Sequence, residues 1–211
     1  MTFPSRRPAI GLFGGSFDPV HNGHLHIARA FADELALDTV IFLPAGDPYH
    51  KGGSRTDARH RLAMAQLAAQ ADPRFAVSDC DIVRRGATYS SDTAAIFRQN
   101  FPAADLWWLL GADSLNTLHT WKNWRQFADT VNIAVARRAD GGTAPTPTHA
   151  ESAAWQRQAE AAGSLKTLSA PLHPASSTDI RRALAGGGDA GALLPPEVAA
   201  YIRRHRLYHA A

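Results

Sequence analysis

The stretch Gly14-Gly15-Ser16-Phe17-Asp18-Pro19-Val20-His21-Asn22-Gly23-His24 joins a short apolar run, Ala9–Phe13, to an amphipathic segment, His24–Leu37. The apolar run has the length of a buried strand, and the segment after the stretch has apolar residues at helical spacing. The sequence therefore predicts a strand, a glycine-rich loop and a helix. Ligands of an open parallel sheet bind beyond the carboxyl ends of its strands, which is where this loop lies, so we expect a ligand site here.

The same alternation of short apolar runs and amphipathic segments continues along the chain. Further strands are predicted at Thr39–Leu43, Phe75–Ser78, Leu106–Leu110, Val131–Ala136 and Leu165–Leu168. Further helices are predicted at Asp57–Ala71, Asp92–Gln99, Ser152–Ala162, Thr178–Ala185 and Pro196–His205. This alternation indicates βαβ units, so we expect an α/β fold, a Rossmann-like doubly wound parallel sheet with helices on both faces. We expect one domain over residues 1–211, with residues 138–149 as a loop insert.

Composition and charge exclude several classes of protein. The net charge is +3 with ten histidines counted neutral, and Lys and Arg do not gather in one run. A small positive excess fits an anionic ligand such as a nucleotide, and it argues against nucleic acid as a partner. The single cysteine, Cys80, excludes an intrachain disulfide, and no Cys and His residues have the spacing of a zinc site. No apolar run has the length of a membrane span or of a signal-peptide core. We therefore expect a cytoplasmic protein without a membrane partner, whose oligomeric state the sequence leaves open.

The residue types of the first stretch suit phosphate chemistry. Gly14 and Gly15 permit close approach of the backbone to a phosphate. No Gly-Lys-Ser/Thr follows them, so the stretch is not a P-loop, and it lacks the G-x-G-x-x-G pattern of dinucleotide-binding loops. His21 and His24 can lie on one side of the turn, where imidazoles at a helix start can donate hydrogen bonds to developing negative charge. Gly23, between them, has no side chain and leaves room for a base or a ribose.

A second polar segment, Ser176-Ser177-Thr178-Asp179-Ile180-Arg181-Arg182, begins a predicted helix late in the chain. Hydroxyl residues at a helix start cap backbone N–H groups, and the same groups can form a cradle for the phosphates of ATP. Arg181 lies about one turn inside the helix, where its guanidinium could fork onto the β- or γ-phosphate. A plain N-cap followed by a solvated basic face would have the same residue types, so both interpretations stay open.

Together the two segments resemble those of the nucleotidyltransferase superfamily with the H-x-G-H motif. The opening G-G-S-F-D-P at Gly14–Pro19 is similar to that of bacterial nicotinate-nucleotide adenylyltransferases. The later segment is similar to the superfamily's I-S-S-T-x-x-R, with Ala175 in place of a larger aliphatic residue. The resemblance extends from Ile10 to about Tyr208 and implies a single nucleotidyltransferase domain. It implies an enzyme that joins ATP to nicotinate mononucleotide, giving nicotinate adenine dinucleotide and pyrophosphate in NAD biosynthesis.

The resemblance also assigns residues to the two substrates. The catalytic residues that it implies are His21, His24 and Arg181. The residues that it implies for ATP binding are Gly14, Gly15, Ser16, Phe17, Gly23, Gly111, Asp113, Ser176, Ser177 and Thr178. The residues that it implies for the acceptor are Asp18, Lys51, Tyr89, Ser90, Trp121 and Arg138.

The acceptor residues have distinct implied roles. In the family, backbone amides in a segment similar to Thr88–Thr93 hold the nicotinate carboxylate, which assigns Tyr89 and Ser90 to that contact. A tryptophan stacks on the pyridine ring, and Trp121 matches it; an electron-rich indole suits a pyridinium cation. Lys51 meets the phosphate of the mononucleotide, and Arg138 is a secondary phosphate contact.

Some of these residues have structural alternatives. Lys51 would equally suit a solvated loop, and Tyr49 stands in its segment where the family has the second proline of a pair. Trp121 would suit a partly buried anchor. Ser91 or Asp92 would suit the N-cap of the next helix, a role that is compatible with acceptor binding.

The implied reaction needs no general base. A phosphate monoester has a second pKa of about 6 and is mostly dianionic at neutral pH, so its oxygen can attack the α-phosphorus of ATP in line while pyrophosphate departs. The protein then contributes positioning and charge neutralisation. We expect Mg²⁺ to bridge the ATP phosphates, held by their oxygens and by water rather than by a protein cage, with Asp18 acting on its water shell.

Three alternatives remain. An enzyme of the same fold could adenylylate nicotinamide mononucleotide or phosphopantetheine, although Tyr89, Ser90 and Trp121 favour a pyridine acceptor. The chain could be a non-catalytic nucleotide-binding regulator, against which the intact H-x-G-H stretch argues. Some aminoacyl-tRNA synthetases share that motif, but the modest charge and the lack of a K-M-S-K-S element argue against RNA binding.

Overall fold

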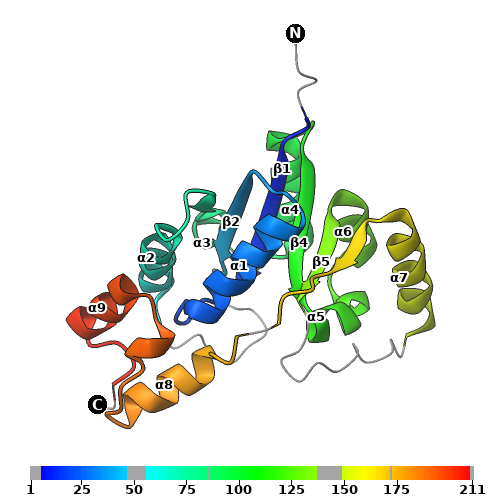
Figure 1. Cartoon of the computed structure of the whole chain (residues 1–211). Coiled ribbons are helices and arrows are strands. Elements are labelled where there is room, and N and C mark those ends of the chain that lie inside the picture. The colour runs from blue at the N-terminus through cyan, green and yellow to red at the C-terminus, as the bar shows by residue number, and fades with distance from the viewer. Residues whose placement is uncertain (1–5, 47–55, 85, 137–148, 172, 210–211) are drawn as a thin grey trace.

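The strands form one parallel sheet of six strands, in the order β3-β2-β1-β4-β5-β6. The computed structural model describes residues 6–46, 56–84, 86–136, 149–171 and 173–209. The strands are β1 (Ala9–Gly15), β2 (Thr39–Pro44), β3 (Phe75–Val77), β4 (Asp105–Gly111), β5 (Asn132–Ala136) and β6 (Leu165–Thr167). The six predicted strands and the predicted doubly wound parallel sheet are confirmed (Figure 1).

The strand order changes direction between β1 and β4. The chain proceeds from β1 outward through β2 to β3, then returns to pair β4 with the other side of β1 and continues through β5 to β6. In an open α/β sheet, ligands bind in the crevice at such a switch point, outside the carboxyl ends of the strands. The two strand ends that border this crevice are Gly15 of β1 and Gly111 of β4.

Helices connect the strands. The longer ones are α1 (Asn22–Glu34), α2 (Ala58–Ala69), α4 (Ser90–Asn100), α7 (Ala150–Ala162), α8 (Ser177–Ala185) and α9 (Pro196–His205), and they confirm the six predicted helices. The short ones are α3 (Cys80–Val83), α5 (Ala112–Asn116), η1 (Leu118–Thr120), α6 (Trp124–Thr130) and η2 (Gly191–Leu193). The sequence did not predict the short helices because one or two turns are too short to show a period of 3.6 residues. Within the described part of the chain, no helix is both long and apolar enough to cross a membrane.

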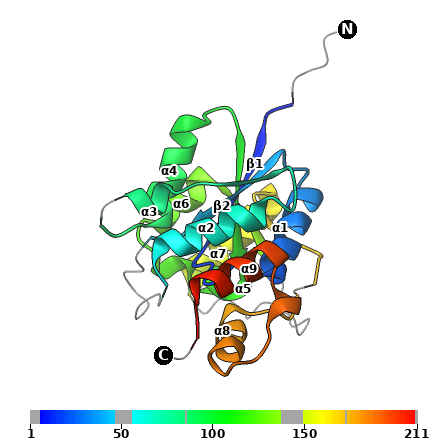
Figure 2. The same ribbon diagram turned by 90° about the vertical axis from the view of Figure 1, so that its left-hand side faces the viewer.

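Two apolar cores lie on the two faces of the sheet. Along β4, Trp107 and Leu109 face the core that includes α1, α2, α8 and α9, whereas Leu106, Trp108 and Leu110 face the core that includes α4–α7. Successive side chains of a strand point to opposite faces, and a parallel sheet covered on both sides is therefore apolar at every position. Figure 2 shows α1 on one side of the sheet and α4 and α6 on the other.

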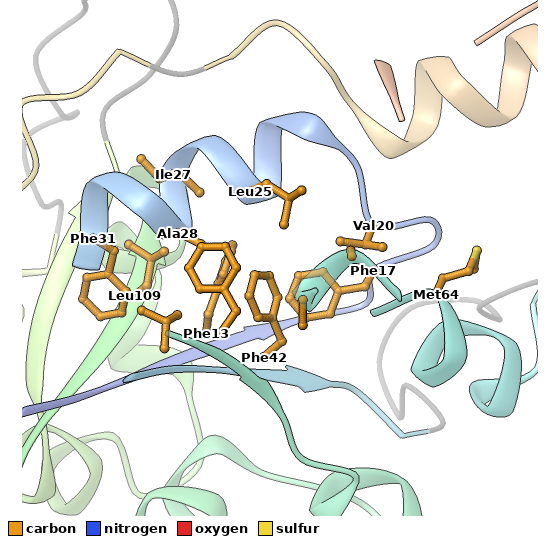
Figure 3. Packing of buried hydrophobic residues seen from close by; sticks show 14 of the residues in the cluster. Phe13, Phe17, Val20, Leu25, Ile27, Ala28, Phe31, Phe42, Met64 and Leu109 are labelled. Carbon is orange, nitrogen blue, oxygen red and sulfur yellow. The ribbon is translucent and has the colours of Figure 1, made fainter. Parts of the chain in front are cut away.

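An aromatic cluster packs the first loop against the sheet beneath α1 (Figure 3). The ring of Phe17 lies 5.4 Å from that of Phe13, edge to face, and 5.5 Å from that of Phe42. Phe17 has a positive φ of 47° and is only 1% exposed. Burial of an aromatic ring of this size contributes about 2–3 kcal/mol to stability. This offsets the cost of a positive φ, which residues other than glycine rarely adopt. The loop is therefore a fixed part of the core.

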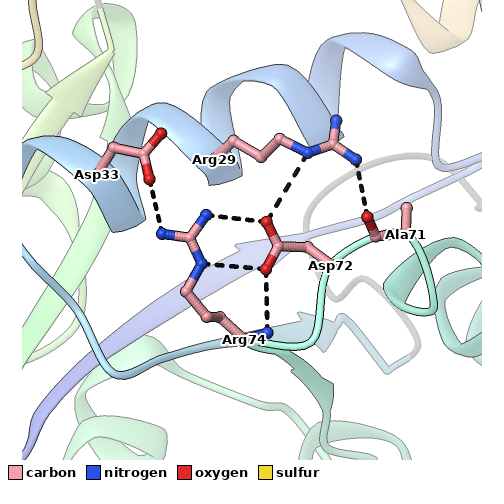
Figure 4. A network of polar contacts seen from close by, with 5 residues as sticks. All are labelled: Arg29, Asp33, Ala71, Asp72 and Arg74. Carbon is pink, nitrogen blue, oxygen red and sulfur yellow. Dashed lines mark hydrogen bonds and ion pairs between the residues drawn. The ribbon is translucent and has the colours of Figure 1, made fainter.

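A polar network fastens α1 to the turn between α2 and β3 (Figure 4). The guanidinium of Arg74 donates to Asp72 at 2.9 and 3.0 Å and to Asp33 of α1 at 2.6 Å. Arg29 of α1 donates to the carbonyl of Ala71 at 3.1 Å. The hydrogen bonds from Arg74 lower the pKa of Asp72 to about 2. The network keeps α1, which carries part of the site, in position on its face of the sheet.

Candidate active site

Three adjoining cavities lie along the crevice at the carboxyl ends of β1 and β4. A cavity of about 250 Å³ is lined by His21, Gly23 and His24, together with Gly111 and Ala175. A cavity of about 660 Å³ is lined by Thr88, Tyr89, Ser90, Thr120, Trp121 and Lys122. A third, of about 220 Å³, shares Gly111 with the first and Ser90 and Trp121 with the second, and Gly14 and Gly15 also line it. The three cavities bring together nine of the predicted site residues: Gly14, Gly15, His21, Gly23, His24, Gly111, Tyr89, Ser90 and Trp121. Arg181 lines a separate cavity of about 440 Å³ together with Tyr208.

The two histidines of the first stretch lie against each other at the start of α1. His21 is the N-cap of the helix, with an extended backbone, and its ring stacks on that of His24 at a centroid distance of 3.7 Å. The backbone N–H of His21 donates to Nδ1 of His24 at 3.2 Å. An imidazole nitrogen that accepts a hydrogen bond carries no proton, so a neutral His24 carries its proton on Nε2. The fold therefore makes Nε2 of His24 a hydrogen-bond donor.

Both histidines are neutral at pH 7. Burial, and then the charge of nearby His173, lower the pKa of His21 from 6.5 to about 4. Burial, and then the charge of His21, hold the pKa of His24 well below its usual value. Both groups consequently act as neutral donors rather than as fixed positive charges before an anionic ligand enters.

Gly23 allows the second polar segment to approach the first. A Cβ atom on Gly23 would lie 3.0 Å from the ring of His21 and 3.3 Å from the carbonyl oxygen of Ala175. Two hydrogen bonds also join the segments. The hydroxyl of Ser177 donates to the backbone carbonyl of Pro19 at 3.0 Å, and the guanidinium of Arg181 donates to the backbone carbonyl of Asp18 at 2.6 Å. A larger residue at position 23 would push these two segments apart.

The second segment begins α8, and Ala175, the residue before it, rather than the segment itself, lines the cavity of the two histidines. A hydroxyl residue caps the helix, as the sequence predicted: it is Ser176, whose hydroxyl accepts from the backbone N–H of Asp179 at 3.1 Å. Ser177 and Thr178 follow in the first turn. Arg181 uses one N–H group on Asp18, and because a guanidinium has five N–H donors, this contact is compatible with binding a phosphate. The N-cap and the phosphate-binding interpretations can hold together.

Three residues predicted for the ATP side occupy different environments. The side chain of Phe17 is in the core, so this residue can meet ATP only through its backbone. Gly111 is the N-cap of α5, and Asp113 lies exposed in the first turn of that helix. The start of α5 therefore borders the crevice with backbone N–H groups that have no intrahelical partner.

Asp18 is buried and bonded to the C-terminal region. It is 4% exposed, and the hydroxyl of Tyr208 donates to its carboxylate at 2.7 Å. Burial raises the pKa of Tyr208, so this hydroxyl keeps its proton. The sequence did not assign Tyr208, since nothing in the pattern around it marks a contact with a residue so distant in the chain. The carboxylate thus ties the first loop to the end of the chain.

The 660 Å³ cavity, which contains three of the residues predicted for the acceptor, is built from the start of α4 and the turn before α6. Tyr89 is the N-cap of α4, so the expectation that Ser91 or Asp92 would cap this helix is wrong. Trp121 is half-buried: its ring lies 5.6 Å from that of Phe127, and it also lines the 660 Å³ cavity. The anchor role and the cavity role therefore coexist in this residue.

Lys122 is an acceptor-side residue that the sequence interpretation missed. Its ammonium group lies 4.1 Å from the centre of the Tyr89 ring, which is a cation–π distance, and it lines the same cavity. Its position next to Trp121 was the only available signal. Lys51 and Arg138, the other cationic residues predicted to meet the acceptor, lie outside the described residues.

Arg61 of α2 is a second residue that the sequence interpretation missed. It is 1% exposed, and its guanidinium donates to three backbone carbonyls, those of Thr56 at 3.2 Å, Ser16 at 2.9 Å and Gly46 at 3.1 Å. Ser16 belongs to the first loop and Gly46 to the loop after β2. One buried side chain therefore joins the loop after β1 to the loop after β2.

Comparison with known proteins agrees with this geometry. The model of the cytidylyltransferase-like family matches residues 12–183. A protein of Neisseria meningitidis named "Probable nicotinate-nucleotide adenylyltransferase" is 59% identical over 199 residues, which cover 94% of this chain and 98% of that protein. A protein of Chromobacterium violaceum with the same name is 44% identical over 207 residues, with 94% and 98% covered.

A solved structure shows the same fold. It is that of Plasmodium falciparum nicotinic acid mononucleotide adenylyltransferase complexed with NaAD, with a TM-score of 0.73, 16% identity, and 96% of this chain and 98% of that chain covered. At 16% identity this structure shows only a shared fold, whereas the sequence relatives and the family model show the family. The chain belongs to the cytidylyltransferase-like family and, within it, to the nicotinate-nucleotide adenylyltransferases.

Proposed function

We propose that this chain, as a single nucleotidyltransferase domain over residues 1–211, transfers the adenylyl group of ATP to nicotinate mononucleotide and releases pyrophosphate. The observation that carries the proposal is the continuous crevice, which has two stacked histidines in one cavity and an indole beside a helix N-terminus in the next. ATP occupies the cavity of His21 and His24, and the pyridine nucleotide occupies that of Trp121. The two substrates then meet over Gly14 and Gly15.

The acceptor phosphate attacks the α-phosphorus, and its P–O bond forms as the bond to the departing pyrophosphate breaks. A dianionic phosphate needs no base, so the residues of the chain orient the groups and stabilise charge. The Nε2–H group of His24 donates to an oxygen of the α-phosphate, where negative charge develops. Arg181 and the start of α8 hold the β- and γ-phosphates, whose charge grows as they depart.

The acceptor half selects a nicotinate over a nicotinamide through backbone donors. The first N–H groups of α4, after Tyr89, have no intrahelical partner and suit a carboxylate. An amide at the same position would bring its own N–H donors toward them. The indole of Trp121 stacks on the pyridinium ring, and Lys122 adds a positive charge that favours an acid over a neutral amide.

The metal that accompanies ATP is held by the substrate more than by the protein. The described residues contain no group of three or more His, Cys, Asp or Glu side chains that could hold a metal ion. Mg²⁺ would be bound through the phosphate oxygens and water, and Asp18, whose buried carboxylate accepts from Tyr208, would act only on that water shell. Mg²⁺ bound in this way would neutralise the phosphates that leave.

An assay with parallel acceptors tests the proposal. We expect the purified protein, with ATP and Mg²⁺, to release pyrophosphate rapidly with nicotinate mononucleotide and slowly or not at all with nicotinamide mononucleotide or phosphopantetheine. Turnover with another acceptor alone would support ATP as the adenylyl donor and reject nicotinate mononucleotide as the acceptor. ATP binding without turnover on any acceptor would identify a nucleotide-binding regulator instead.

Replacement of Trp121 by alanine is expected to raise the KM for nicotinate mononucleotide about tenfold, because stacking of a cation on an indole contributes about 1–2 kcal/mol. The KM for ATP should change little, since Trp121 lies in the acceptor cavity. Steady-state kinetics with each substrate varied in turn measures both values. Trp124→Ala is a matched control, because the Trp124 ring packs edge to face on Trp155 and does not line the 660 Å³ cavity. Equal effects of the two variants would contradict the stacking role.

A further inference from the structure

The hydroxyl of Tyr208, near the end of the chain, contacts the first loop, and the mechanism above does not use it. It donates to Oδ1 of Asp18 at 2.7 Å. Asp18 is buried and Tyr208 is half-buried, so water has little access to this hydrogen bond. Tyr208 also lines the 440 Å³ cavity together with Arg181. The family resemblance assigns no role to Tyr208.

The backbone adopts an unfavourable conformation to bring Tyr208 to this place. Helix α9 ends at its C-cap Arg206, which has a φ of 51°, and Tyr208 itself has a φ of 67°. Phe17, the neighbour of Asp18, has a φ of 47°. A left-handed conformation costs a residue with a side chain about 1–3 kcal/mol, persists only where the surrounding contacts determine it, and is common at functional sites. Both partners of this hydrogen bond therefore lie on backbone that the rest of the fold must hold in place.

The Tyr208 hydroxyl serves as a donor and as an acceptor. Burial raises the pKa of Tyr208, so the hydroxyl keeps the proton that it donates to Asp18, and it accepts a hydrogen bond from Thr56. Thr56 is itself buried, and its carbonyl accepts from Arg61, which also binds the carbonyl of Ser16. The first loop is therefore held at Ser16 by Arg61 and at Asp18 by Tyr208, and Thr56 contacts both of these side chains.

Asp18 connects Tyr208 to Arg181. The carboxylate of Asp18 accepts from Tyr208, while its backbone carbonyl accepts from Nη1 of Arg181 at 2.6 Å. A guanidinium is a rigid planar fork, so a hydrogen bond from one of its nitrogens restricts the directions of its other N–H groups. The direction in which Arg181 can meet an anion therefore depends on where the carbonyl of Asp18 is held.

We propose that Tyr208 is a positioning residue for adenylyl transfer: its hydrogen bond to Asp18 fixes the carbonyl that orients Arg181 toward the departing phosphates of ATP. The inference rests on the proposed function, because it takes Arg181 to bind those phosphates. Tyr208 itself contacts no reacting atom. Its effect is confined to the pyrophosphate end of ATP, where negative charge grows as the bond to the α-phosphorus breaks.

Two ligands that correspond to the two ends of ATP separate this role from a general structural one. Pyrophosphate contains the groups that Arg181 would bind, whereas AMP contains only the adenosine and the α-phosphate. Tyr208→Phe keeps the aromatic ring and removes the hydroxyl. Tyr201→Phe is a matched control on α9, because the Tyr201 hydroxyl lies 2.9 Å from Nδ1 of His60 rather than on the first loop. Calorimetry in the presence of Mg²⁺ measures the Kd of pyrophosphate and of AMP, and pyrophosphate release measures the kinetics.

We expect Tyr208→Phe to raise the Kd of pyrophosphate about tenfold, the scale of a lost hydrogen bond to a charged group, and to lower kcat/KM for ATP by a similar factor. The Kd of AMP and the KM of nicotinate mononucleotide should stay within about twofold of the wild type, as should every value for Tyr201→Phe. Unchanged AMP binding would also show that the variant is folded. An unchanged Kd of pyrophosphate, or an equal loss of AMP and pyrophosphate binding, would overturn the inference.

A double variant tests whether Tyr208 acts through Arg181. In an Arg181→Ala background, Tyr208→Phe should have no further effect on the Kd of pyrophosphate or on kcat/KM for ATP, because the group that it orients is absent. Additive losses would overturn the inference. Wild-type protein that binds ATP without turnover would reject the proposed function, and the Kd values of the same variants would still decide whether Tyr208 positions Arg181.

Discussion

Replacement of His24 by alanine is expected to lower the kcat of adenylyl transfer by a factor of about 10²–10³, the usual effect of removing a donor that stabilises transition-state charge. The Nε2–H group of His24 is such a donor, because the bond from the His21 backbone occupies Nδ1. Its pKa lies well below 6.5, so the imidazole is neutral and its proton stays on that nitrogen across the neutral range. Steady-state kinetics with both substrates saturating measures the change.

His24→Asn distinguishes the donor from the cap. Its Oδ1 can still accept from the backbone N–H of His21, so the start of α1 keeps its hydrogen bond while the distal donor is lost. We expect kcat to fall nearly as far as in His24→Ala, with a smaller effect on stability, since loss of an N-terminal cap costs about 1 kcal/mol. An increase in the KM for ATP with an unchanged kcat would show that His24 binds the ground state and has no special role in the transition state.

Replacement of Arg61 by leucine is expected to lower the free energy of unfolding by about 3–5 kcal/mol. The leucine fills part of the volume but leaves three carbonyl groups, of Thr56, Ser16 and Gly46, without their donor. An unsatisfied buried polar group costs about 1–3 kcal/mol, and the groups here are coupled because one guanidinium serves all of them. Urea denaturation followed by tryptophan fluorescence measures the loss.

The neighbouring Arg59 supplies a matched control on the same helix. Its side chain is 88% exposed and makes a surface ion pair with Asp57 at 3.3 Å. Such pairs contribute less than about 1 kcal/mol, so Arg59→Leu should change stability little. Arg61→Lys should be nearly as unstable as Arg61→Leu, since one ammonium cannot reproduce a planar fork that reaches two loops. Equal stabilities of the Arg59 and Arg61 leucine variants would contradict this account of the two loops.

Replacement of Arg61 is also expected to lower the catalytic efficiency toward both substrates. Ser16 and Gly46 lie next to Gly15 and Ala45, which line the 220 Å³ cavity, and the buried guanidinium holds both loops. In a variant that still folds at the assay temperature, we therefore expect a fall in kcat/KM for both substrates. An effect on one substrate only would show that the two loops move independently.

Local patterns in the sequence were enough to predict the framework of the protein. Strands β1, β2, β4 and β5 are short apolar runs because both faces of the sheet are covered there, whereas β6 has only Leu165 buried and its Lys166 and Thr167 exposed. Each long helix has apolar residues every three or four positions on the face that it buries. The loop Gly14–His24 was also predictable, because glycines mark places where the backbone must come close to another group. Gly23, for example, lies against the second polar segment. A cap by a hydroxyl residue at the start of α8 was predictable because such a cap is local: the hydroxyl of Ser176 bonds to a backbone N–H only three residues away.

Short elements and cap positions were less predictable. Helices α3, α5 and α6 contain too few turns to show a period, and Tyr89 caps α4 without a side-chain hydrogen bond, so no residue preference marks it. In such places the backbone follows the packing of the surrounding elements rather than a local signal.

The sequence by itself determined the strand and helix order, the two polar segments and the chemistry that they can perform. Only the tertiary structure decided that Arg61 is buried, that Tyr208 bonds to Asp18 and that His173 lines the cavity of His21 and His24. Arginine is usually exposed, and the partners of Arg61 include carbonyls 15 and 45 residues away, whereas Tyr208 and Asp18 are 190 residues apart. Backbone carbonyl and amide groups are present in every residue, so a side chain that binds them leaves no pattern in the sequence, and only the packed fold shows which of them it meets.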